Sequence, residues 1–378
     1  MRSYLANVML IPKMKKELLA TNMILKELTK DKELQLQLVL YSKSPCNSIE
    51  LAAAQSIVMT NEPHLSIWKK YLERDGANDW EKLQASIPQF RIPIREGISK
   101  TAAYIDVVKK GQPFTKVNFN GEFSLEHPDL FKCSIYSHPA GSLPVLYTQV
   151  RQDFENLYRL LGFRCEPIII PTSVNGLMVS GFINRERIIK YKTIWLKKNK
   201  DQLAGLDWSI EMRRIEQEEP WQFKDRFILV MKAPYSGIST AELALEFSEK
   251  IWHEKSLQLR IEHELTHYAI KRLFGVMRVH LWDEIIADFM GISHALKEYR
   301  ASWLLRFLGL DEKGNVLPNA RILHYVKNVS PDFFSLLCQL VVRVSHGLET
   351  TYHHHYTQQD RLQFLLEFAQ LSLLDMAE

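Results

Sequence analysis

Residues 261–268 read Ile-Glu-His-Glu-Leu-Thr-His-Tyr and contain two histidines, His263 and His267, with Glu264 between them. On a helix, residues four positions apart lie on one face, about 6 Å from each other. Two imidazoles at this spacing can bind one Zn²⁺. Glu264 would lie beside the ion, where it can accept a proton from activated water. The run therefore predicts a catalytic zinc site, provided that the segment is helical and a third ligand exists.

The surrounding residues predict that this segment is a long helix. Ser239-Thr-Ala-Glu242 has the capping-box pattern, and apolar residues recur at helical spacing from Leu243 to Phe274. Gly275 is typical of a helix end. Because the run is long for one globular helix, we expect a break near His253–Ser256.

A second acidic run supplies the third ligand. Residues 283–291 read Asp-Glu-Ile-Ile-Ala-Asp-Phe-Met-Gly, in which Asp283 can cap a helix and Glu284 shares a face with Asp288. Glu284 follows His267 by 17 positions, enough for a turn that returns the chain. A carboxylate there would complete a His₂Glu site, and Asp288 could accept the other ring N–H of a ligand histidine.

Two nearby residues need a separate interpretation. His280 could rival Glu284 as a ligand, but Glu284 is favoured because Asp288 comes with it. Glu262 points about 100° away from His263 on a helix, so we expect a solvated charge.

The two runs together carry a resemblance. His-Glu-Leu-Thr-His followed by Glu-x-x-x-Asp-x-x-Gly resembles the gluzincin zinc peptidases, the thermolysin-like clan. The resemblance covers residues 263–291 and implies that His263, His267 and Glu284 bind zinc. It implies further that Glu264 is the general base and that Asp288 orients a ligand histidine. The metzincin pattern is absent, since glycine and histidine are missing at the two positions it requires.

Gluzincins usually stabilise the developing oxyanion with a His or Tyr downstream of the third ligand. We favour His346, at the end of a predicted apolar helix, and Tyr352 just beyond it as catalytic residues of this kind. No local motif selects among the remaining candidates, which are His324, Tyr325, His353, His354, His355 and Tyr356.

Composition limits the classes of partner. Of 378 residues, 46% are hydrophobic and 24% charged, as in soluble globular proteins. A net charge of +4 without a long basic run does not indicate nucleic acid. No apolar stretch approaches the length of a membrane span, and the first residues lack a secretory signal pattern, so we expect a cytoplasmic protein without membrane contact. The four cysteines form no C-x-x-C pair, which predicts reduced structural thiols. Nothing here predicts an oligomeric state.

The periodicity along the chain predicts an α+β fold. We expect a helical or mixed N-terminal region over residues 1–150, of unknown role, and a mostly helical zincin-like metallohydrolase domain with a small mixed sheet over residues 151–378. Strands are predicted at 90–94, 116–119, 145–147, 167–170, 188–195 and 227–231, and helices at 15–40, 49–71, 99–110, 149–162, 331–346 and 360–374. The resemblance implies that the strand at 226–232 borders the cleft and can pair with an extended substrate.

These patterns favour a zinc metallopeptidase that cleaves a limited set of protein or peptide substrates. A zinc hydrolase of a non-peptide amide or ester in a biosynthetic pathway would use the same metal chemistry. A zinc-containing regulatory or binding protein is a third class, against which the presence of Glu264 argues.

Overall fold

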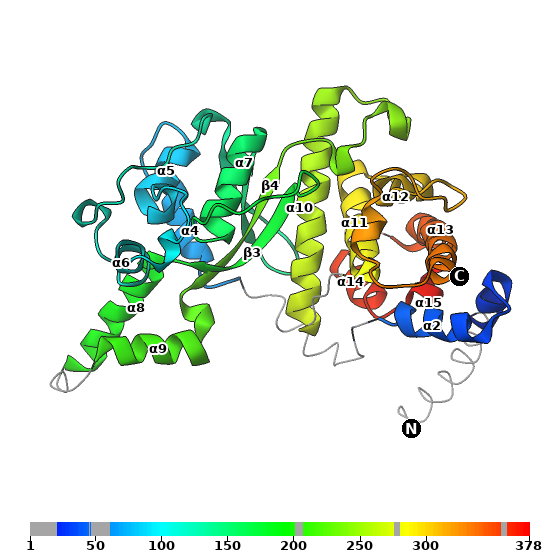
Figure 1. The fold of residues 1–378 in the computed structure, drawn as a ribbon, viewed down its shortest axis with the longest axis horizontal. Helices are drawn as coiled ribbons and strands as arrows, with labels where there is room; N and C mark the ends of the chain where they lie inside the picture. The colour runs from blue at the N-terminus through cyan, green and yellow to red at the C-terminus, as the bar shows by residue number, and fades with distance from the viewer. Residues whose placement is uncertain (1–20, 45, 47–60, 201–206, 276–279, 357–360) are drawn as a thin grey trace. The chain divides into compact units, whose positions relative to one another are not determined.

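The computed structural model describes residues 21–44, 46, 61–200, 207–275, 280–356 and 361–378 (Figure 1). The chain divides into two compact units. The sheet unit comprises residues 60–233, and the helical unit comprises residues 1–59 together with 234–378. The boundary predicted near residue 150 is wrong, because it falls between two elements that belong to the same sheet unit.

One four-stranded mixed sheet forms in the sheet unit. A small mixed sheet was predicted, but within residues 151–378 beside the motif runs, whereas two of its strands precede residue 151 and the motif runs belong to the other unit. Its strands are β1 (Lys132–Tyr136), β2 (Leu143–Thr148), β3 (Gly176–Ile183) and β4 (Lys224–Met231), in the order β1-β2-β4-β3. β2 pairs with β4 in parallel, whereas β1–β2 and β3–β4 are antiparallel. A parallel pair requires a crossover connection. Because β2 precedes residue 150 and β4 follows it, the pairing of these two strands joins residues on both sides of 150 in one unit.

β4 is an interior strand. Leu229 pairs with Leu146 of β2 on one edge and with Leu177 of β3 on the other. The prediction of a strand at 227–231 is confirmed, but the expectation that its edge pairs with substrate is wrong, because both edges are already occupied within the sheet.

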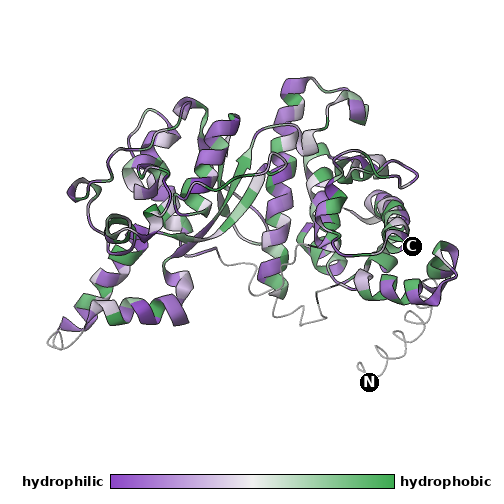
Figure 2. Cartoon of the chain, in the orientation of Figure 1, coloured by the Kyte–Doolittle hydropathy of each residue, from purple (hydrophilic) through white to green (hydrophobic). Residues whose placement is uncertain are grey.

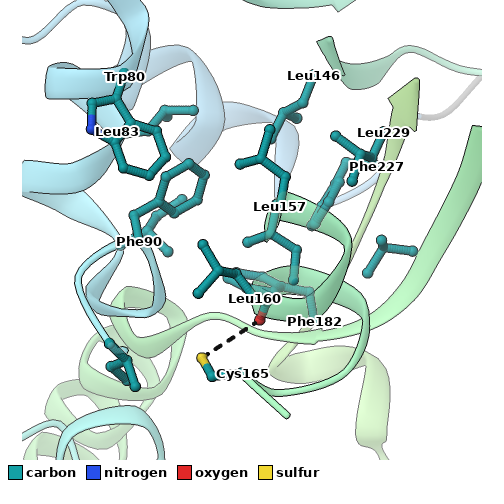
Figure 3. Close-up of a cluster of buried hydrophobic side chains, with 14 of the residues drawn as sticks. Trp80, Leu83, Phe90, Leu146, Leu157, Leu160, Cys165, Phe182, Phe227 and Leu229 are labelled. Carbon is teal, nitrogen blue, oxygen red and sulfur yellow. Dashed lines mark hydrogen bonds between the residues drawn. The ribbon is translucent and has the colours of Figure 1, made fainter. Parts of the chain in front are cut away.

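Helices and an apolar core pack against the sheet. The helical elements of this unit are α4 (Leu65–Leu72), α5 (Asp79–Ser86), α6 (Ala102–Tyr104), the π-helical turn η3 (Ile105–Lys109), α7 (Arg151–Leu157), the π-helical turn η6 (Tyr158–Gly162), α8 (Arg185–Lys198) and α9 (Trp208–Glu218). Figure 3 shows the core, in which Trp80 and Phe90 face Leu157 and Leu160. Burial of these large side chains supplies most of the unit's stability.

Several predicted strands are absent from the structure. Residues 188–195 belong to α8, whose cap Asn184 accepts a hydrogen bond from the backbone N–H of Glu186. The cap and the basic residues along α8 favour helix over strand. Residues 90–94, 116–119 and 167–170 form no strand, and Ile169 is 94% exposed.

The helical unit holds the two motif runs. Its elements are a helix at residues 21–28, α2 (Lys32–Ser42), α10 (Glu249–Phe274), α11 (Leu281–Leu296), α12 (Ala301–Leu308), α13 (Pro331–His355), α14 (Arg361–Phe368) and α15 (Leu373–Met376). The helix predicted at 15–40 is interrupted before α2, and its first residues, 15–20, lie outside the described part. Residues 49–60 of the helix predicted at 49–71 also lie outside it. The helix predicted at 360–374 ends at Phe368.

α10 is one continuous helix of 26 residues, so the break expected near His253 is wrong. Ser248 caps its start by accepting from the Ile251 N–H, and Gly275 ends it with φ 70°. Ser239 and Glu242 do form the reciprocal bonds of a capping box, but these open only the short 3₁₀ turn Ala241–Leu243.

Hydropathy is mixed within the elements of both units (Figure 2). In the part of the chain that the structure describes, every helix is too short or too polar to cross a bilayer. All four cysteines are buried and none is in a disulfide among the described residues, consistent with the predicted structural thiols.

Candidate metal centre

The centre lies where α10 packs against α11, side by side in Figure 1. α10 carries His263, Glu264 and His267, and α11 carries Glu284 and Asp288. Gly291 makes the close approach of the helices possible, because a Cβ there would lie 2.8 Å from the Leu259 carbonyl oxygen. The glycine of the second motif is thus a packing requirement.

His263, His267 and Glu284 converge on one point. The Nε2 atoms of the two histidines are 3.1 Å apart. His263 Nε2 lies 3.4 Å from Glu284 Oε2, and His267 Nε2 lies 3.6 Å from Glu284 Oε1. Each side chain is about one-tenth exposed. Among the described residues these three form the single group of His, Cys, Asp or Glu with metal-ligand spacing.

These separations fit a tetrahedral zinc ion. Ligand atoms about 2.0–2.1 Å from a tetrahedral Zn²⁺ are about 3.3 Å from one another. The distance of 3.1 Å between the two Nε2 atoms is close to that value. The nearest carboxylate oxygens of Glu284 are Oε2, 3.4 Å from His263 Nε2, and Oε1, 3.6 Å from His267 Nε2, and with one ligand atom from each residue the three atoms lie within 4.8 Å of one another. Three protein ligands also leave a fourth position open, as in catalytic zinc sites.

Asp288 fixes the ring of His263. The buried carboxylate accepts from His263 Nδ1 at 2.8 Å. Because a carboxylate can only accept, Nδ1 carries a proton, so Nε2 is the ring nitrogen that can bind a metal. This is the orienting role that the sequence assigned to Asp288, and it raises the basicity of the ligand nitrogen.

Two further residues complete the support of Asp288. Tyr235 donates from its hydroxyl to Asp288 Oδ1, and Arg321 forms an ion pair with Asp288 Oδ2. Arg321 also donates to the Tyr235 hydroxyl at 3.1 Å. The Tyr235 backbone N–H is anchored to Ser256 Oγ of α10. Sequence reasoning missed both residues, because neither lies in a motif and no periodicity marks them.

The cluster favours a positive charge at the point where the ligand atoms meet. Burial disfavours charged forms, but the hydrogen bonds to Asp288 and Glu284 outweigh it and raise the pKa of His263 to about 10. Burial lowers the pKa of His267 to about 4. For Glu284 burial is opposed by the His263 hydrogen bond and the nearby cationic groups, which hold its pKa well below the usual range. A site with one carboxylate ligand and one neutral imidazole suits a divalent cation.

Glu264 lies next to this cluster on α10 and is not held by a hydrogen bond to another described residue. Its carboxylate is half-buried and makes no hydrogen bond with any residue that the structure describes. Burial raises its pKa, and the charge of Glu284 adds to this effect. Arg260, one turn earlier on α10, attracts it and stacks over Tyr235 at 5.3 Å. An unengaged carboxylate of raised pKa is suited to accept a proton.

The downstream candidates separate into two groups. Tyr325 lies beside the centre: its ring is 5.9 Å from the Arg321 guanidinium carbon, and the charge of Glu284 adds to burial in raising the pKa of its hydroxyl. His346, one of the two favoured residues, is instead an exposed residue of α13 beside Glu349. The other, Tyr352, stacks on Tyr356 at 5.2 Å. The structure brings neither side chain into contact with the three ligand candidates, so Tyr325 replaces both as the oxyanion candidate.

His280 and Asp283 have other roles than those expected. His280 caps α11, because its Nδ1 accepts from the Trp282 N–H, and its ring packs on Tyr41 at 4.3 Å. Asp283 lies inside the first turn of α11 and is buried, so it is not the cap.

Glu262 is fully buried, which contradicts the expectation of a solvated charge. Its carboxylate lies 3.3 Å from the guanidinium of Arg361 on α14 and 3.6 Å from His294 Nε2 on α11. α14 covers a face of α10 that the local sequence marks as polar.

Comparison with known proteins supplies a family and no further relative. No curated protein and no solved structure matches the chain. The sequence matches one family, described as a family of unknown function, over residues 23–378. This match spans nearly the whole chain and includes every residue of the candidate centre. The protein therefore belongs to that family, DUF7005.

Proposed function

We propose that the protein is a zinc-dependent metallopeptidase of gluzincin type with a zincin-like catalytic unit. One observation carries the proposal: one ligand atom from each of His263, His267 and Glu284 lies within 4.8 Å of the other two, and the two Nε2 atoms are 3.1 Å apart, a group compact enough to bind one zinc ion. The motif runs supply the same three residues independently. Zinc is favoured over magnesium or calcium because two of the three ligands are imidazoles.

The chemistry divides between the metal and the chain. A bound zinc supplies Lewis-acid activation of water and of a carbonyl group. Glu264 accepts the proton of the attacking water and transfers it to the leaving amine. Its freedom from other hydrogen bonds leaves both carboxylate oxygens available for this transfer.

Tyr325 is the proposed donor to the developing oxyanion. Burial raises its pKa well above the usual value, so the hydroxyl keeps its proton at neutral pH. Its ring packs beside Arg321, the partner of Asp288, which puts Tyr325 close to the ligand cluster. A single donor of this kind contributes about 3 kcal/mol to transition-state stabilisation.

Asp288, Tyr235 and Arg321 act as positioning residues. They hold the His263 ring with Nδ1 protonated, so that its Nε2 can serve as a ligand. The proposed substrates are a limited set of peptides or proteins, the class that the resemblance of residues 263–291 implies.

The test is cleavage of a proteome-derived peptide library by the zinc-loaded protein, read by mass spectrometry. Glu264→Gln is expected to keep the metal and lose at least about a hundredfold in rate. Glu254→Gln, at an exposed position of the same helix, is the matched control and is expected to cleave like the wild type.

Two results would change the assignment. Unaltered turnover by Glu264→Gln would refute its role as the base. A wild-type protein that leaves every peptide intact but hydrolyses small amides or esters would belong to the second class of zinc hydrolase.

A further inference from the structure

The side of α8 that faces away from α9 is exposed to solvent, and we call it the outer face of α8. Figure 1 shows α8 leading away from the sheet and α9 leading back toward it. The two helices pack through Tyr191 and Trp195 of α8, whose rings contact Trp208 of α9. The exposed residues on the outer face are Ile189, Lys190, Thr193, Ile194, Leu196, Lys197 and Lys198, with Lys200 just beyond the end of the helix.

The four lysines of the outer face have no counter-ion in the described part of the sheet unit. None of them forms an ion pair with a described residue, and residues 187–200 contain no aspartate or glutamate. The two arginines of α8 are engaged within the unit instead. Arg187 pairs with the buried Asp225, and Arg185 donates to the Gly111 carbonyl oxygen. The cations that α8 presents to solvent are therefore lysines.

The nearby acidic residues pair with other cations. Of the four glutamates in α9 and at its C-terminal cap, three pair with Arg214 on the same helix. The fourth, Glu216, pairs with Lys109 of η3. Glu186, in the first turn of α8, pairs with Arg74. These ion pairs leave the charge of the four lysines in place, so the outer face is strongly cationic.

Three aliphatic side chains are interleaved with the lysines. Ile189, Ile194 and Leu196 are 40%, 46% and 38% exposed. At about 100° per residue, Ile194 lies between Lys190 and Lys198 around the helix, and Ile189 lies within about 20° of Leu196. Burial of such side chains at the boundary between headgroups and acyl chains is favourable. The outer face thus offers both positive charge and apolar contact to a partner.

The composition of the outer face favours a bilayer over a protein or a nucleic acid as this partner. Protein interfaces are depleted in lysine, and their main binding residues are tryptophan, tyrosine and arginine. Nucleic-acid sites also favour arginine and stacked aromatic rings. Lysines mixed with aliphatic side chains suit an anionic membrane surface, because the long lysine stem keeps the ammonium group at the headgroups while the aliphatic groups enter below it.

We propose that the outer face of α8 binds the surface of a bilayer that contains anionic phospholipids. α8 lies along the surface, its lysines contact the anionic groups of the lipids, and Ile189, Ile194 and Leu196 insert among the headgroups. The composition of the whole chain does not indicate this partner, because a net charge of +4 does not reveal a local concentration of lysines. The surface is independent of the proposed peptidase activity and shares no residue with the metal centre.

Flotation of the full chain with lipid vesicles, at increasing lipid concentration, tests the proposal. One set of vesicles contains phosphatidylcholine alone, and the other contains phosphatidylcholine and phosphatidylserine at about 7:3. Each lysine near an anionic surface contributes about fivefold in affinity, or about 1 kcal/mol. The chain is therefore expected to bind the anionic vesicles at least about a hundredfold more tightly in about 0.1 M salt. Raising the salt to about 0.5 M is expected to remove most of this preference, because it shortens the Debye length to about 4 Å.

Two variants assign the binding to the outer face. The first combines Lys190→Gln, Lys197→Gln, Lys198→Gln and Lys200→Gln. Glutamine keeps the helix propensity and removes the charge, so this variant is expected to bind anionic vesicles at least about a hundredfold more weakly. The second, Ile194→Gln with Leu196→Gln, keeps the charge and is expected to bind about tenfold more weakly.

The matched control removes four exposed lysines elsewhere in the sheet unit by combining Lys69→Gln, Lys70→Gln, Lys116→Gln and Lys132→Gln. It has the same net charge as the first variant but an intact outer face, and it is expected to bind vesicles like the wild type. Thermal unfolding followed by circular dichroism verifies that each variant is folded.

The proposal is overturned if the chain does not bind the anionic vesicles up to about 5 mM lipid. It is equally overturned if the first variant and the control bind alike. Retention on heparin that the first variant loses, without vesicle binding, would assign the outer face to a soluble polyanion and refute a membrane partner. Glu264→Gln is expected to bind vesicles like the wild type, so failure of this proposal is distinguishable from failure of the proposed function.

Discussion

Replacing Asp288 with asparagine removes one negative charge from a carboxylate that binds three partners. The shape of the side chain is nearly unchanged, so the perturbation is electrostatic. The hydrogen bond from His263 Nδ1 to Oδ1 loses its charged acceptor, and Arg321, which pairs with Oδ2, loses its counter-ion. An amide oxygen at the position of Oδ1 can still accept from both His263 and Tyr235, but as a neutral and weaker acceptor. The variant therefore tests the support of the centre without removing a ligand.

Two magnitudes follow from the structure. Breaking a buried ion pair costs about 3–5 kcal/mol, and the low end applies because the Arg321 side chain is 21% exposed. A loss of about 3 kcal/mol lowers the melting temperature of a unit of this size by about 6–12 °C. Loss of a carboxylate that orients a ligand histidine lowers metal affinity about 10- to 100-fold, or about 1.4–2.7 kcal/mol. The destabilisation should appear without zinc and increase when zinc is present.

Scanning calorimetry with a chelator and with zinc, together with a competitive zinc titration, measures both quantities. Asp332→Asn, at an exposed position on α13, is the control and should cost less than about 1 kcal/mol. If Asp288→Asn has wild-type stability in the chelator and wild-type zinc affinity, the network around His263 does not support the centre as described.

Three other variants test separate parts of the account. Tyr325→Phe is expected to keep zinc and to lose about 10²–10³-fold in turnover, whereas His346→Ala is expected to lose little. Peptide cleavage kinetics measure both, and equal losses in the two variants would count against Tyr325. Burial lowers the pKa of His64 below its usual 6.5, so the unfolded chain binds a proton more readily than the folded chain. The free energy of unfolding is therefore highest above pH 6.5, and below that pH it falls by up to about 1.4 kcal/mol per pH unit. Denaturant titrations from pH 7.5 to 5 should show a smaller fall in His64→Gln, and an identical fall would exclude His64 as its source. Glu262→Ala leaves the Arg361 guanidinium buried without its carboxylate partner and is expected to lower the free energy of unfolding, measured in urea, by about 3–5 kcal/mol. A loss below about 1 kcal/mol would instead indicate that Glu262 is a solvated charge.

The helix pair was predictable because its information is local. Imidazoles four residues apart define one face of α10, and Glu284 with Asp288 defines one face of α11. Gly291 of the second motif then allows the helices to approach closely. A mixed sheet was also predictable in kind, since residues 145–148 of β2 and 227–231 of β4 are rich in strand-forming residues.

Remote contacts account for what the sequence did not predict. Arg321 pairs with Asp288, 33 positions earlier in the chain, and Glu262 pairs with Arg361, 99 positions later. The residues next to Asp288 and Glu262 in the sequence therefore do not predict either ion pair. His346 resembled Tyr325 as an oxyanion donor until the packing of α13 was known. Residues 188–195 of α8 are rich in isoleucine and aromatic residues, which favour a strand, whereas the cap at Asn184 favours a helix.

X-ray absorption at the zinc edge of the purified, zinc-loaded protein tests the ligand set most directly. The expected result is one zinc per chain with about four nitrogen and oxygen neighbours at about 2.0–2.2 Å, a clear imidazole signature, and loss of this spectrum in His267→Ala. Sulfur neighbours, or a spectrum that is the same in His267→Ala, would mean that the ion is bound elsewhere and that the convergence of α10 and α11 is not a zinc centre.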